Sequence, residues 1–333
     1  MSPALRRLDA SKVLVTGGAG FIGSATVDEL LRTGVGEVVV IDDMVRGRPE
    51  NLKTAMSSGR VRLVEGDICD QALMGNLIRG SDIVFHLAAL RITQCAAEPR
   101  RAMEVMVSAT YDLLEQCVDA QVSKVVMASS ASVYGMASAF PTSEDHNPYA
   151  NRTLYGAAKV FGEGLLRTFN DAHGLDYVAL RYFNAYGPRM DIHGRYTEVL
   201  IRWMERIAAG QRPVVFGDGS QTLDMVHVGD IARANVLAAR ASASDVALNV
   251  GSGAETSLLR LAEMLAEEMG VASLTPLHEE ERAVNPVPKR QADISLALTQ
   301  IGFAPEISLR EGLRDLVRWW QDEKLEAPVR QVS

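Results

Sequence analysis

The sequence of 333 residues contains only three cysteines. Cys69, Cys95 and Cys117 are too few for a disulfide framework, form no CxxC pair, and are spaced too widely for a compact zinc site. The six histidines include no HExxH motif, so the sequence predicts no bound metal. Scarce, unpaired cysteines are typical of proteins in a reducing compartment, and we expect a cytoplasmic location.

Long apolar runs and an excess of basic residues are also lacking. No apolar stretch reaches the ~18–20 residues that a membrane-spanning helix needs, and the first residues show no signal-peptide pattern. Asp and Glu number 42 against 34 Lys and Arg. The resulting net charge of −8 argues against nucleic acid or an anionic membrane surface as a partner, although a small basic pocket for a phosphate remains compatible with it.

Short β-branched runs alternate with helical patterns in the first half of the chain. Strands are predicted at 12–16, 37–41, 60–65, 82–85 and 124–129, and helices at 21–32, 71–79, 99–118 and 155–170. The strands are apolar throughout, as expected for strands buried on both faces of a parallel sheet. We therefore predict the α/β class, with a doubly wound Rossmann-type sheet over residues 12–180.

Beyond residue 180 the elements become shorter. A helix is predicted at 197–209, strands at 213–216 and 222–226 around the turn Gly217-Asp218-Gly219, helices at 230–240 and 257–269, and a strand at 246–250. We expect residues 181–325 to form mainly a smaller α/β lobe that binds substrate, with some segments returning to the sheet domain.

The first strand runs into a glycine-rich loop, Thr16-Gly17-Gly18-Ala19-Gly20-Phe21-Ile22-Gly23, and then into a helix. Gly17 and Gly20 allow the backbone to turn and approach a pyrophosphate, while Gly23 allows the helix to pack on the strand. Free amides at the start of the helix would face the phosphates. This pattern predicts a dinucleotide site.

Asp42, at the end of the second strand, indicates which dinucleotide binds. A carboxylate at this place accepts hydrogen bonds from the adenosine ribose and repels a 2′-phosphate, so NAD is predicted. Arg46 and Arg48 lie just downstream and keep NADP open as the alternative.

Ser130, Tyr155 and Lys159 form a candidate catalytic group. Tyr155 and Lys159 are spaced i, i+4 on one helical face, and Ser130 follows a central strand. Ionising a phenol at neutral pH requires its pKa to fall by ~3 units, or ~4 kcal/mol. An ammonium about 5 Å away supplies ~3 kcal/mol at an effective dielectric constant near 20. Lys159 is therefore expected to lower the pKa of Tyr155, the catalytic base, while Ser130 holds the reacting oxygen. The alternative is that the three residues have no catalytic role. Tyr155 would then be a packed phenol, Lys159 a solvated amine and Ser130 a turn residue.

Further landmarks extend over nearly the whole chain. They are Gly66-Asp67-Ile68, His86-Leu87-Ala88-Ala89-Leu90-Arg91, Arg181-Tyr182-Phe183-Asn184-Ala185-Tyr186-Gly187-Pro188-Arg189, Phe216-Gly217-Asp218-Gly219-Ser220-Gln221-Thr222, and Arg290 ahead of Ala292-Asp293-Ile294. With the glycine loop and the catalytic group, they make the sequence resemble the extended short-chain dehydrogenase/reductase family, in particular the nucleotide-sugar 4-epimerases.

The resemblance implies a set of contacts to NAD, among which Lys159 holds the nicotinamide ribose. The cofactor residues are Gly17, Gly20, Phe21, Ile22, Gly23, Asp42, Asp43, Asp67, Ile68, Leu87, Ala88, Ala89, Arg91, Tyr155, Lys159 and Phe183. The substrate residues are Arg91, Ser130, Asn184, Phe216 and Arg290, of which Arg290 is expected at the diphosphate. The plain alternatives are a turn-stabilising amide for Asn184, a core ring for Phe216 and a surface base for Arg290.

The sequence departs from the pattern of this family in three respects. Leu223 stands where an arginine commonly grips the diphosphate, and Met106 replaces a cofactor-side asparagine. Ala131 and Ser132 stand where dehydratases and uronate decarboxylases carry carboxylates. The last departure favours epimerisation over elimination, because a second acid–base group is missing.

The resemblance thus implies NAD-dependent epimerisation at C4 of a nucleotide-linked sugar through a transient 4-keto intermediate. The expected substrate is a UDP-hexose, a UDP-hexuronate or a UDP-N-acetylhexosamine. The alternatives are a dehydratase, a decarboxylase, a 4-ketoreductase, or a non-catalytic NAD-sensing protein of the same fold. Relatives pair through a four-helix bundle, so a homodimer through the helices at 99–118 and 155–170 is expected.

Overall fold

The computed structural model describes residues 7–192, 198–280 and 287–326. Its centre is a seven-stranded sheet with the strand order β11-β6-β5-β4-β1-β2-β3, and every neighbouring pair is parallel. The strands are β1 (Lys12–Thr16), β2 (Glu37–Asp42), β3 (Val61–Glu65), β4 (Ile83–His86), β5 (Lys124–Ser130), β6 (Tyr177–Tyr182) and β11 (Val246–Val250). The predicted α/β class with a doubly wound parallel sheet is confirmed.

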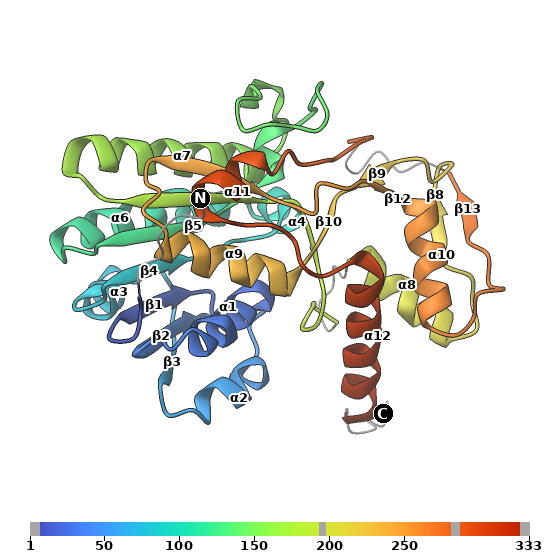
Figure 1. Cartoon of the computed structure of the whole chain (residues 1–333), viewed down its shortest axis with the longest axis horizontal. Helices are drawn as coiled ribbons and strands as arrows, with labels where there is room; N and C mark the ends of the chain where they lie inside the picture. Colours follow the sequence, from blue (N-terminus) through green and yellow to red (C-terminus); the bar gives the residue numbers. More distant parts are fainter. Residues whose placement is uncertain (1–6, 193–197, 281–286, 327–333) are drawn as a thin grey trace.

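Helices cover both faces of this sheet (Figure 1). One face is covered by α3 (Gln71–Ile78), α6 (Ala109–Asp119) and α7 (Leu154–His173), and the other by α1 (Phe21–Arg32), α2 (Lys53–Met56), α9 (Val228–Arg240) and α11 (Ser295–Ile301). Val38 and Val40 of β2 face the α1 and α9 side, whereas Val39 and Ile41 face the α3 and α6 side. Because both sets are buried, the strand shows no polar alternation.

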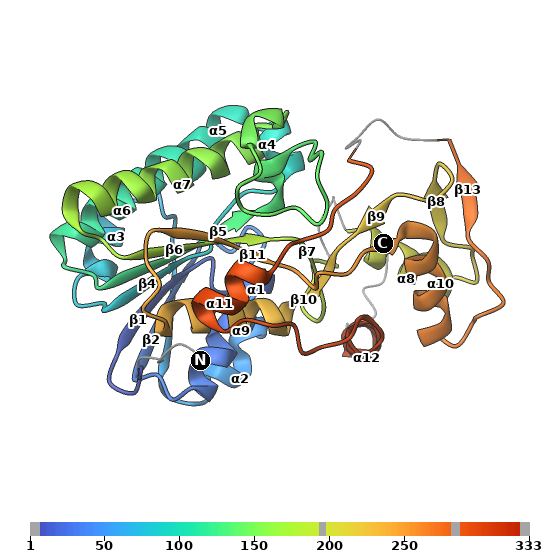
Figure 2. The same cartoon turned by 45° about the horizontal axis from the view of Figure 1, so that its top comes forward.

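A smaller lobe lies beside the carboxyl ends of the strands (Figures 1 and 2). Its helices are α8 (Val199–Ala208), α10 (Leu258–Glu268) and α12 (Leu309–Glu326), and they share an apolar core that includes Trp203, Leu261 and Leu316. Its short strands are β7 (Asn184–Tyr186), β8 (Val214–Phe216), β9 (Thr222–Leu223), β10 (Met225–His227), β12 (Thr256–Ser257) and β13 (Leu277–Glu279). None of the described helices is long and apolar enough to cross a membrane.

The two strands expected on either side of the turn at Gly217 do not pair with each other. Residues 213–216 and 222–226 do not form a hairpin, since β8 pairs in parallel with β13 and β9 pairs antiparallel with β12. The strand expected at 222–226 is divided into β9 and β10, and β10 pairs in parallel with β7. Each partner comes from a distant segment of the chain, which local turn signals around Gly217 cannot reveal.

One predicted helix needs correction, and one strand of the sheet has no counterpart among the predictions. The helix expected at 99–118 consists of α5 (Pro99–Met103), a π-helical turn η2 (Glu104–Ser108) and α6. Strand β6 was not predicted, because its end is rich in aromatic residues and runs into a turn-rich segment. Helix α8 begins at Val199, while the predicted start at Thr197 lies outside the described residues.

Candidate active site

The glycine loop is held close to the neighbouring backbone. Gly17 has a positive φ of 67°, and a Cβ atom there would lie 2.8 Å from the Cα atom of Ala88. A Cβ at Gly23 would lie 2.1 Å from the carbonyl oxygen of Gly17. Gly20 is the N-cap of α1 and supplies no side-chain cap, so the amides of the first turn, at Phe21 and Ile22, are directed at the loop. This cradle fits a pyrophosphate.

Asp42, at the end of β2, is hydrogen-bonded to the glycine loop. Its Oδ2 accepts a hydrogen bond of 3.0 Å from the amide of Ala19, and its Oδ1 accepts one of 3.0 Å from the amide of Met44. Burial raises the pKa of Asp42, although these amides lower it in part. Each carboxylate oxygen keeps further lone pairs, so the group can also accept hydrogen bonds from a ribose. The next residue, Asp43, is exposed and accepts from the amide of Val45 at 3.0 Å.

Asp67 and Ile68, which are expected to contact NAD, lie just after β3. Asp67 accepts a hydrogen bond of 2.9 Å from the amide of Cys69, and Ile68 is buried in the core beside it. The guanidinium of Arg101 forms an ion pair with Asp67. Burial raises the pKa of Asp67, but the Cys69 amide and Arg101 together lower it below its usual value. Arg101 lies on α5, far in the chain from this motif, so no local pattern in the sequence points to it.

The segment after β4 contacts the glycine loop. The amides of Leu87 and Ala88 donate to Oγ1 of Thr16 at 3.2 and 3.1 Å, whereas Ala89 is exposed. The side chain of Arg91 approaches carboxylates of the lobe, Asp191 at 3.8 Å and Glu198 at 3.5 Å. Phe183, expected at the cofactor, is buried after β6.

The structure brings Ser130, Tyr155 and Lys159 together. Ser130 ends β5, and its Oγ accepts a hydrogen bond of 3.1 Å from the amide of Ser132. Tyr155 lies in the first turn of α7, and its hydroxyl forms a hydrogen bond with Ser130. One turn later, Nζ of Lys159 donates a hydrogen bond of 2.6 Å to the carbonyl of Ala128 and lies 5.8 Å from the centre of the Tyr155 ring.

The charges around Tyr155 differ from the expectation. Burial raises the pKa of Tyr155, while Ser130 and the charge of Arg290 lower it by less. Burial also lowers the pKa of Lys159 to about 8. The expected net lowering of the Tyr155 pKa by Lys159 is therefore wrong for the chain alone, because desolvation of the phenolate outweighs the nearby groups.

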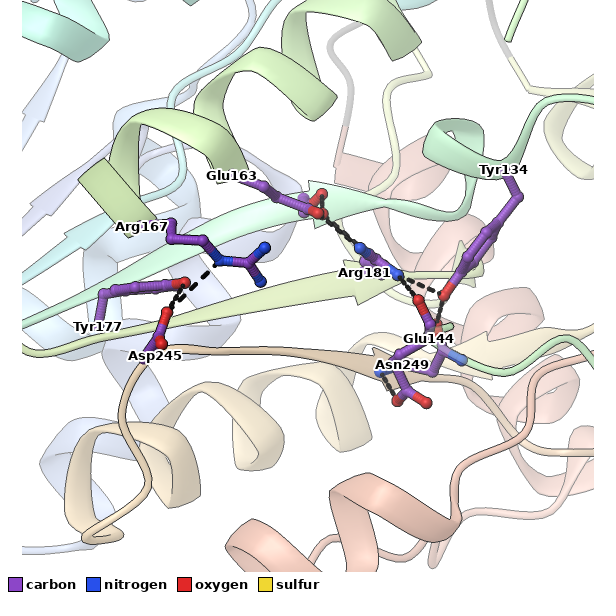
Figure 3. Close-up of polar contacts among 9 residues, drawn as sticks. Tyr134, Glu144, Glu163, Arg167, Tyr177, Arg181, Asp245 and Asn249 are labelled. Atoms are coloured by element: carbon purple, nitrogen blue, oxygen red, sulfur yellow. Dashed lines mark hydrogen bonds and ion pairs between the residues drawn. The ribbon is translucent and has the colours of Figure 1, made fainter. Parts of the chain in front are cut away.

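A buried polar network supports the catalytic helix (Figure 3). Glu163 lies one turn after Lys159 and receives two hydrogen bonds from Arg181, from Nε at 2.9 Å and from Nη2 at 2.6 Å. Ser129, the neighbour of Ser130, also donates to Glu163. On its other side, Arg181 donates from Nη1 to the hydroxyl of Tyr134 at 2.9 Å. The network joins α7 to β5 and β6.

The same network reaches the segment that carries Arg290. The Tyr134 hydroxyl donates to Oδ1 of Asn249 at 2.6 Å, and Nδ2 of Asn249 donates to the carbonyls of Thr142 and Asp293, each at 2.9 Å. Asn249 belongs to β11, and Asp293 follows Arg290 by three residues. Arg181 and Asp293 belong to the sequence landmarks, whereas Glu163, Tyr134 and Asn249 lie far apart in the chain and no local motif links them.

The expected substrate residues lie in different places. Asn184 begins β7, and its side-chain Oδ1 is buried without a hydrogen-bond partner among the described residues. Arg290 is partly buried, its amide donates to the carbonyl of Thr222 at 3.0 Å, and its charge lowers the pKa of Tyr155. Phe216 is partly buried on β8, beside β13, in the part of the lobe far from the sheet (Figure 2).

The three departures from the family pattern are visible as local packing. Leu223 packs against the lobe core. Met106 is buried in the π-helical turn, with its sulfur 3.5 Å from that of Cys95. Ala131 and Ser132 are buried in the 3-10 turn after β5, so these two positions contribute no carboxylate. Within the described ranges, no group of three His, Cys, Asp or Glu side chains is arranged to hold a metal ion.

Comparison with known proteins agrees with this geometry. The model of the NAD dependent epimerase/dehydratase family matches residues 13–251. The chain belongs to this family. It is 37% identical to a UDP-glucose 4-epimerase of Mycolicibacterium smegmatis over 94% of this chain and 99% of that protein.

Two solved structures extend the similarity to three dimensions. A UDP-N-acetylglucosamine 4-epimerase from Methanobrevibacter ruminantium, in complex with UDP-N-acetylmuramic acid, superposes with a TM-score of 0.89 at 34% identity, covering 95% of this chain and 99% of that one. A UDP-glucose 4-epimerase from Thermotoga maritima, with UDP-glucose, gives a TM-score of 0.87 at 34% identity, covering 94% and 99%. NAD is accordingly the cofactor of this family member.

Proposed function

We propose that the protein is an NAD-dependent epimerase acting at C4 of a nucleotide-linked sugar. The observation that carries this proposal is the hydrogen-bonded group of Ser130 and Tyr155, with Lys159 one turn further along α7. This group lies at the carboxyl edge of the sheet, the edge at which the glycine loop also lies, and ligands of open α/β sheets bind at this edge. The UDP-sugar epimerases to which the chain is similar support a UDP-linked substrate.

The residues of the cofactor site fit NAD. The glycine loop leaves no room for side chains at Gly17 and Gly23, and the Asp42 carboxylate stands beside it for the ribose. NAD, when bound, accepts hydride from the sugar and returns it, and its oxidised ring carries a positive charge. That charge favours an ionised phenol, which burial of Tyr155 disfavours in the chain alone.

The three catalytic side chains have distinct roles in this proposal. Tyr155 removes the proton of the 4-hydroxyl and later gives it back, while Ser130 donates a hydrogen bond to the same sugar oxygen. Lys159 holds the nicotinamide ribose and keeps a cation near the phenol. The 4-keto sugar turns over between the two half-reactions, so hydride returns to the opposite face and no net redox change occurs.

The lack of a carboxylate at Ala131 and Ser132 favours epimerisation over two alternatives. Elimination of water or loss of carbon dioxide requires proton transfer at a second sugar carbon, and the groups expected for that step are missing. A 4-ketoreductase would differ in consuming external NADH or NADPH.

One incubation separates these reactions. The purified protein is mixed with a panel of UDP-, GDP-, CDP- and dTDP-sugars without added reductant, and the products are identified by NMR. The C4 epimer is the expected product. A dehydrated or decarboxylated sugar, or conversion that depends on stoichiometric NADH, would contradict the proposal.

We also propose that the protein forms a homodimer through α5, α6 and α7. Met103, Tyr111 and Phe161 lie on these three helices and are 46%, 44% and 50% exposed, so each helix offers a large apolar side chain to a partner. Sedimentation should show a dimer at micromolar concentration and a monomer for Phe161→Glu, whereas a monomeric unmodified protein would contradict the proposal. The cytoplasmic location stays a prediction.

A further inference from the structure

Ser130 and Tyr155 belong to different elements, so a contact between these elements has to set their separation. Ser130 ends β5 and is the N-cap of the 3-10 turn η3 (Ala131–Tyr134), whereas Tyr155 lies in the first turn of α7. The segment that connects η3 with α7 contains Asn151, and the side chain of Asn151 forms hydrogen bonds to both sides.

The side-chain amide of Asn151 uses both of its polar atoms. Its Nδ2 donates a hydrogen bond of 3.0 Å to the carbonyl of Ser132 in η3. Its Oδ1 accepts hydrogen bonds from the amide of Thr153 at 2.8 Å and from the hydroxyl of Thr153 at 3.3 Å. Thr153 is the N-cap of α7, and its Oγ1 accepts a hydrogen bond of 3.1 Å from the amide of Gly156. One planar group thus connects η3 with the start of α7.

On the η3 side, the backbone of Ser132 continues the connection to Ser130. The amide of Ser132 donates to Oγ of Ser130 at 3.1 Å, while its carbonyl accepts from Asn151. Because Oγ of Ser130 is the acceptor in this bond, its own hydrogen remains available for donation. At the far end of η3, the hydroxyl of Tyr134 accepts from Arg181 at 2.9 Å (Figure 3). The turn is therefore held at both ends, and Asn151 links it to the helix.

Two glycines leave the room that this link needs. A Cβ atom at Gly156 would lie 2.1 Å from Nδ2 of Asn151 and 2.6 Å from the carbonyl oxygen of Ser132. Gly135 follows η3 with a positive φ of 56°, and a Cβ atom there would lie 2.2 Å from the carbonyl oxygen of Ala150 and 2.6 Å from the amide nitrogen of Asn151. A side chain at either position would displace Asn151 or the backbone beside it.

We propose that Asn151 is a positioning residue that sets the separation of Ser130 and Tyr155 for epimerisation. This inference rests on the proposed function, which gives these two side chains their roles at the sugar hydroxyl. Asn151 acts through them and takes no part in binding the sugar or NAD. Misplacing a reacting group by about 1 Å can cost ~100-fold in rate. Loss of the link should therefore lower kcat more than it changes KM.

The pKa of Tyr155 provides a readout that a loss of stability alone does not move. Burial raises this pKa and the hydrogen bond of Ser130 lowers it in part, while Cys95 raises it and Arg290 lowers it. Among these groups, Ser130 is the one linked to α7 through Asn151. A weaker contact with Ser130 therefore raises the pKa of Tyr155, and a base with a higher pKa moves the acidic limb of the pH–rate profile to higher pH.

The test compares three variants with the unmodified holoenzyme on the same UDP-sugar. Asn151→Ala removes the hydrogen bonds of the side chain on both sides. Asn151→Ser keeps a hydroxyl that can accept from the amide of Thr153, as serine side chains do in turns, but this hydroxyl is too short to reach Ser132. Thr153→Val is the control, because it removes the cap of α7 at Gly156 and leaves Nδ2 of Asn151 on Ser132.

Both Asn151 variants should lose kcat while they keep their affinities. We expect kcat to fall about tenfold or more, with KM and the Kd of NAD changed by less than about threefold. The acidic limb of kcat/KM should move to higher pH by roughly 0.5 unit or more. Asn151→Ser keeps a partner for the start of α7, so it should unfold in urea close to the unmodified protein and decide the question if Asn151→Ala does not fold. Thr153→Val should be less stable in urea but keep the position of the acidic limb.

Three results would overturn the positioning role. They are a near-normal kcat in folded Asn151→Ser, an equal shift of the acidic limb in Thr153→Val, which would assign the effect to the cap, and a loss of NAD or sugar affinity without a fall in kcat. The proposed function fails in a different way. An unmodified, NAD-containing protein that epimerises no nucleotide sugar would overturn it, and the role of Asn151 in epimerisation with it.

Discussion

Arg181 on β6 donates to both carboxylate oxygens of Glu163, with N–O distances of 2.9 and 2.6 Å, and Glu163 lies on the catalytic helix α7. Burial lowers the pKa of Lys159 to about 8, and Cys95 and then Glu163 raise it in part. The ion pair therefore does more than join α7 to β6. It places a carboxylate where it favours the charged form of the lysine one turn away.

Glu163→Gln is expected to shift the alkaline limb of the pH–rate profile to lower pH. Loss of the carboxylate removes a group that favours the ammonium of Lys159, so its pKa falls further below about 8 and its charge is lost at lower pH. Arg181 would also lose its carboxylate partner, and breaking a buried ion pair costs roughly 3–5 kcal/mol of unfolding free energy. The pH profile of kcat measures the shift of the alkaline limb, and urea unfolding measures the loss of stability. Asp171→Asn, an exposed change on the same helix, is the control.

Tyr155→Phe should abolish nearly all turnover without loss of NAD. The phenol is the proposed base, and general acid–base groups contribute about 10²–10⁴-fold to the rate. The ring remains in place, so the first turn of α7 and the cofactor site should persist. Single-substrate kinetics and the absorbance of bound NAD are the measurements, and a variant with a near-normal rate would refute the assignment of the base.

Asp42→Asn should weaken the preference for NAD over NADP. The amide removes the charge that repels a 2′-phosphate, while its oxygen can still accept a hydrogen bond from one of the amides of Ala19 and Met44. Calorimetric titration should show that the Kd for NADP divided by the Kd for NAD falls about tenfold or more, which corresponds to ~1.4 kcal/mol. Glu50→Gln, an exposed change nearby, should leave the ratio unaltered. An unchanged ratio in Asp42→Asn would rule out the ribose contact.

His86 should make the protein sensitive to mild acid. Its ring lies between the hydroxyls of Thr16 and Thr110 at 3.0 and 3.1 Å, and burial lowers its pKa to about 3. Below pH ~6.5, His86 therefore takes up a proton in the unfolded chain but not in the folded chain. The free energy of unfolding is thus expected to be about 2 kcal/mol lower at pH 5 than at pH 7. Urea unfolding at pH 7 and pH 5 measures this loss.

The control for this prediction is a histidine at the surface. His86→Gln should show a smaller difference between the two pH values than the unmodified protein, whereas exposed His173→Gln should show the same difference. If His86→Gln kept the full pH dependence, another group would be responsible for it.

The parts of the fold predicted well from the sequence are those set by local chemistry. The strand at 12–16 and the helix at 21–32 have the predicted bounds, because a buried β-branched run, three glycines and an apolar helical face specify them within a short window. The i, i+4 pair of Tyr155 and Lys159 was placed on one helical face by spacing alone, and α7 holds both residues.

The parts that were missed depend on contacts between distant segments. Burial of the Tyr155 phenol, which reverses the expected direction of its pKa shift, follows from packing that spacing does not reveal. The segment of Arg290 is held by long-range hydrogen bonds, from the amide of Arg290 to Thr222 and from the amide of Ala292 to Asp224. The ion pair of Glu163 and Arg181 likewise joins α7 to a strand that the sequence analysis did not recognise.

Strand β11 completes the sheet from residues that follow the first part of the lobe. During synthesis, the open edge of β6 would have no neighbour until Val246–Val250 has left the ribosome. An unpaired strand edge invites association with other chains. Fragments that end after β6 but before β11 should therefore aggregate. An exchange of the lobe between relatives would have to leave β11 with the sheet that it completes.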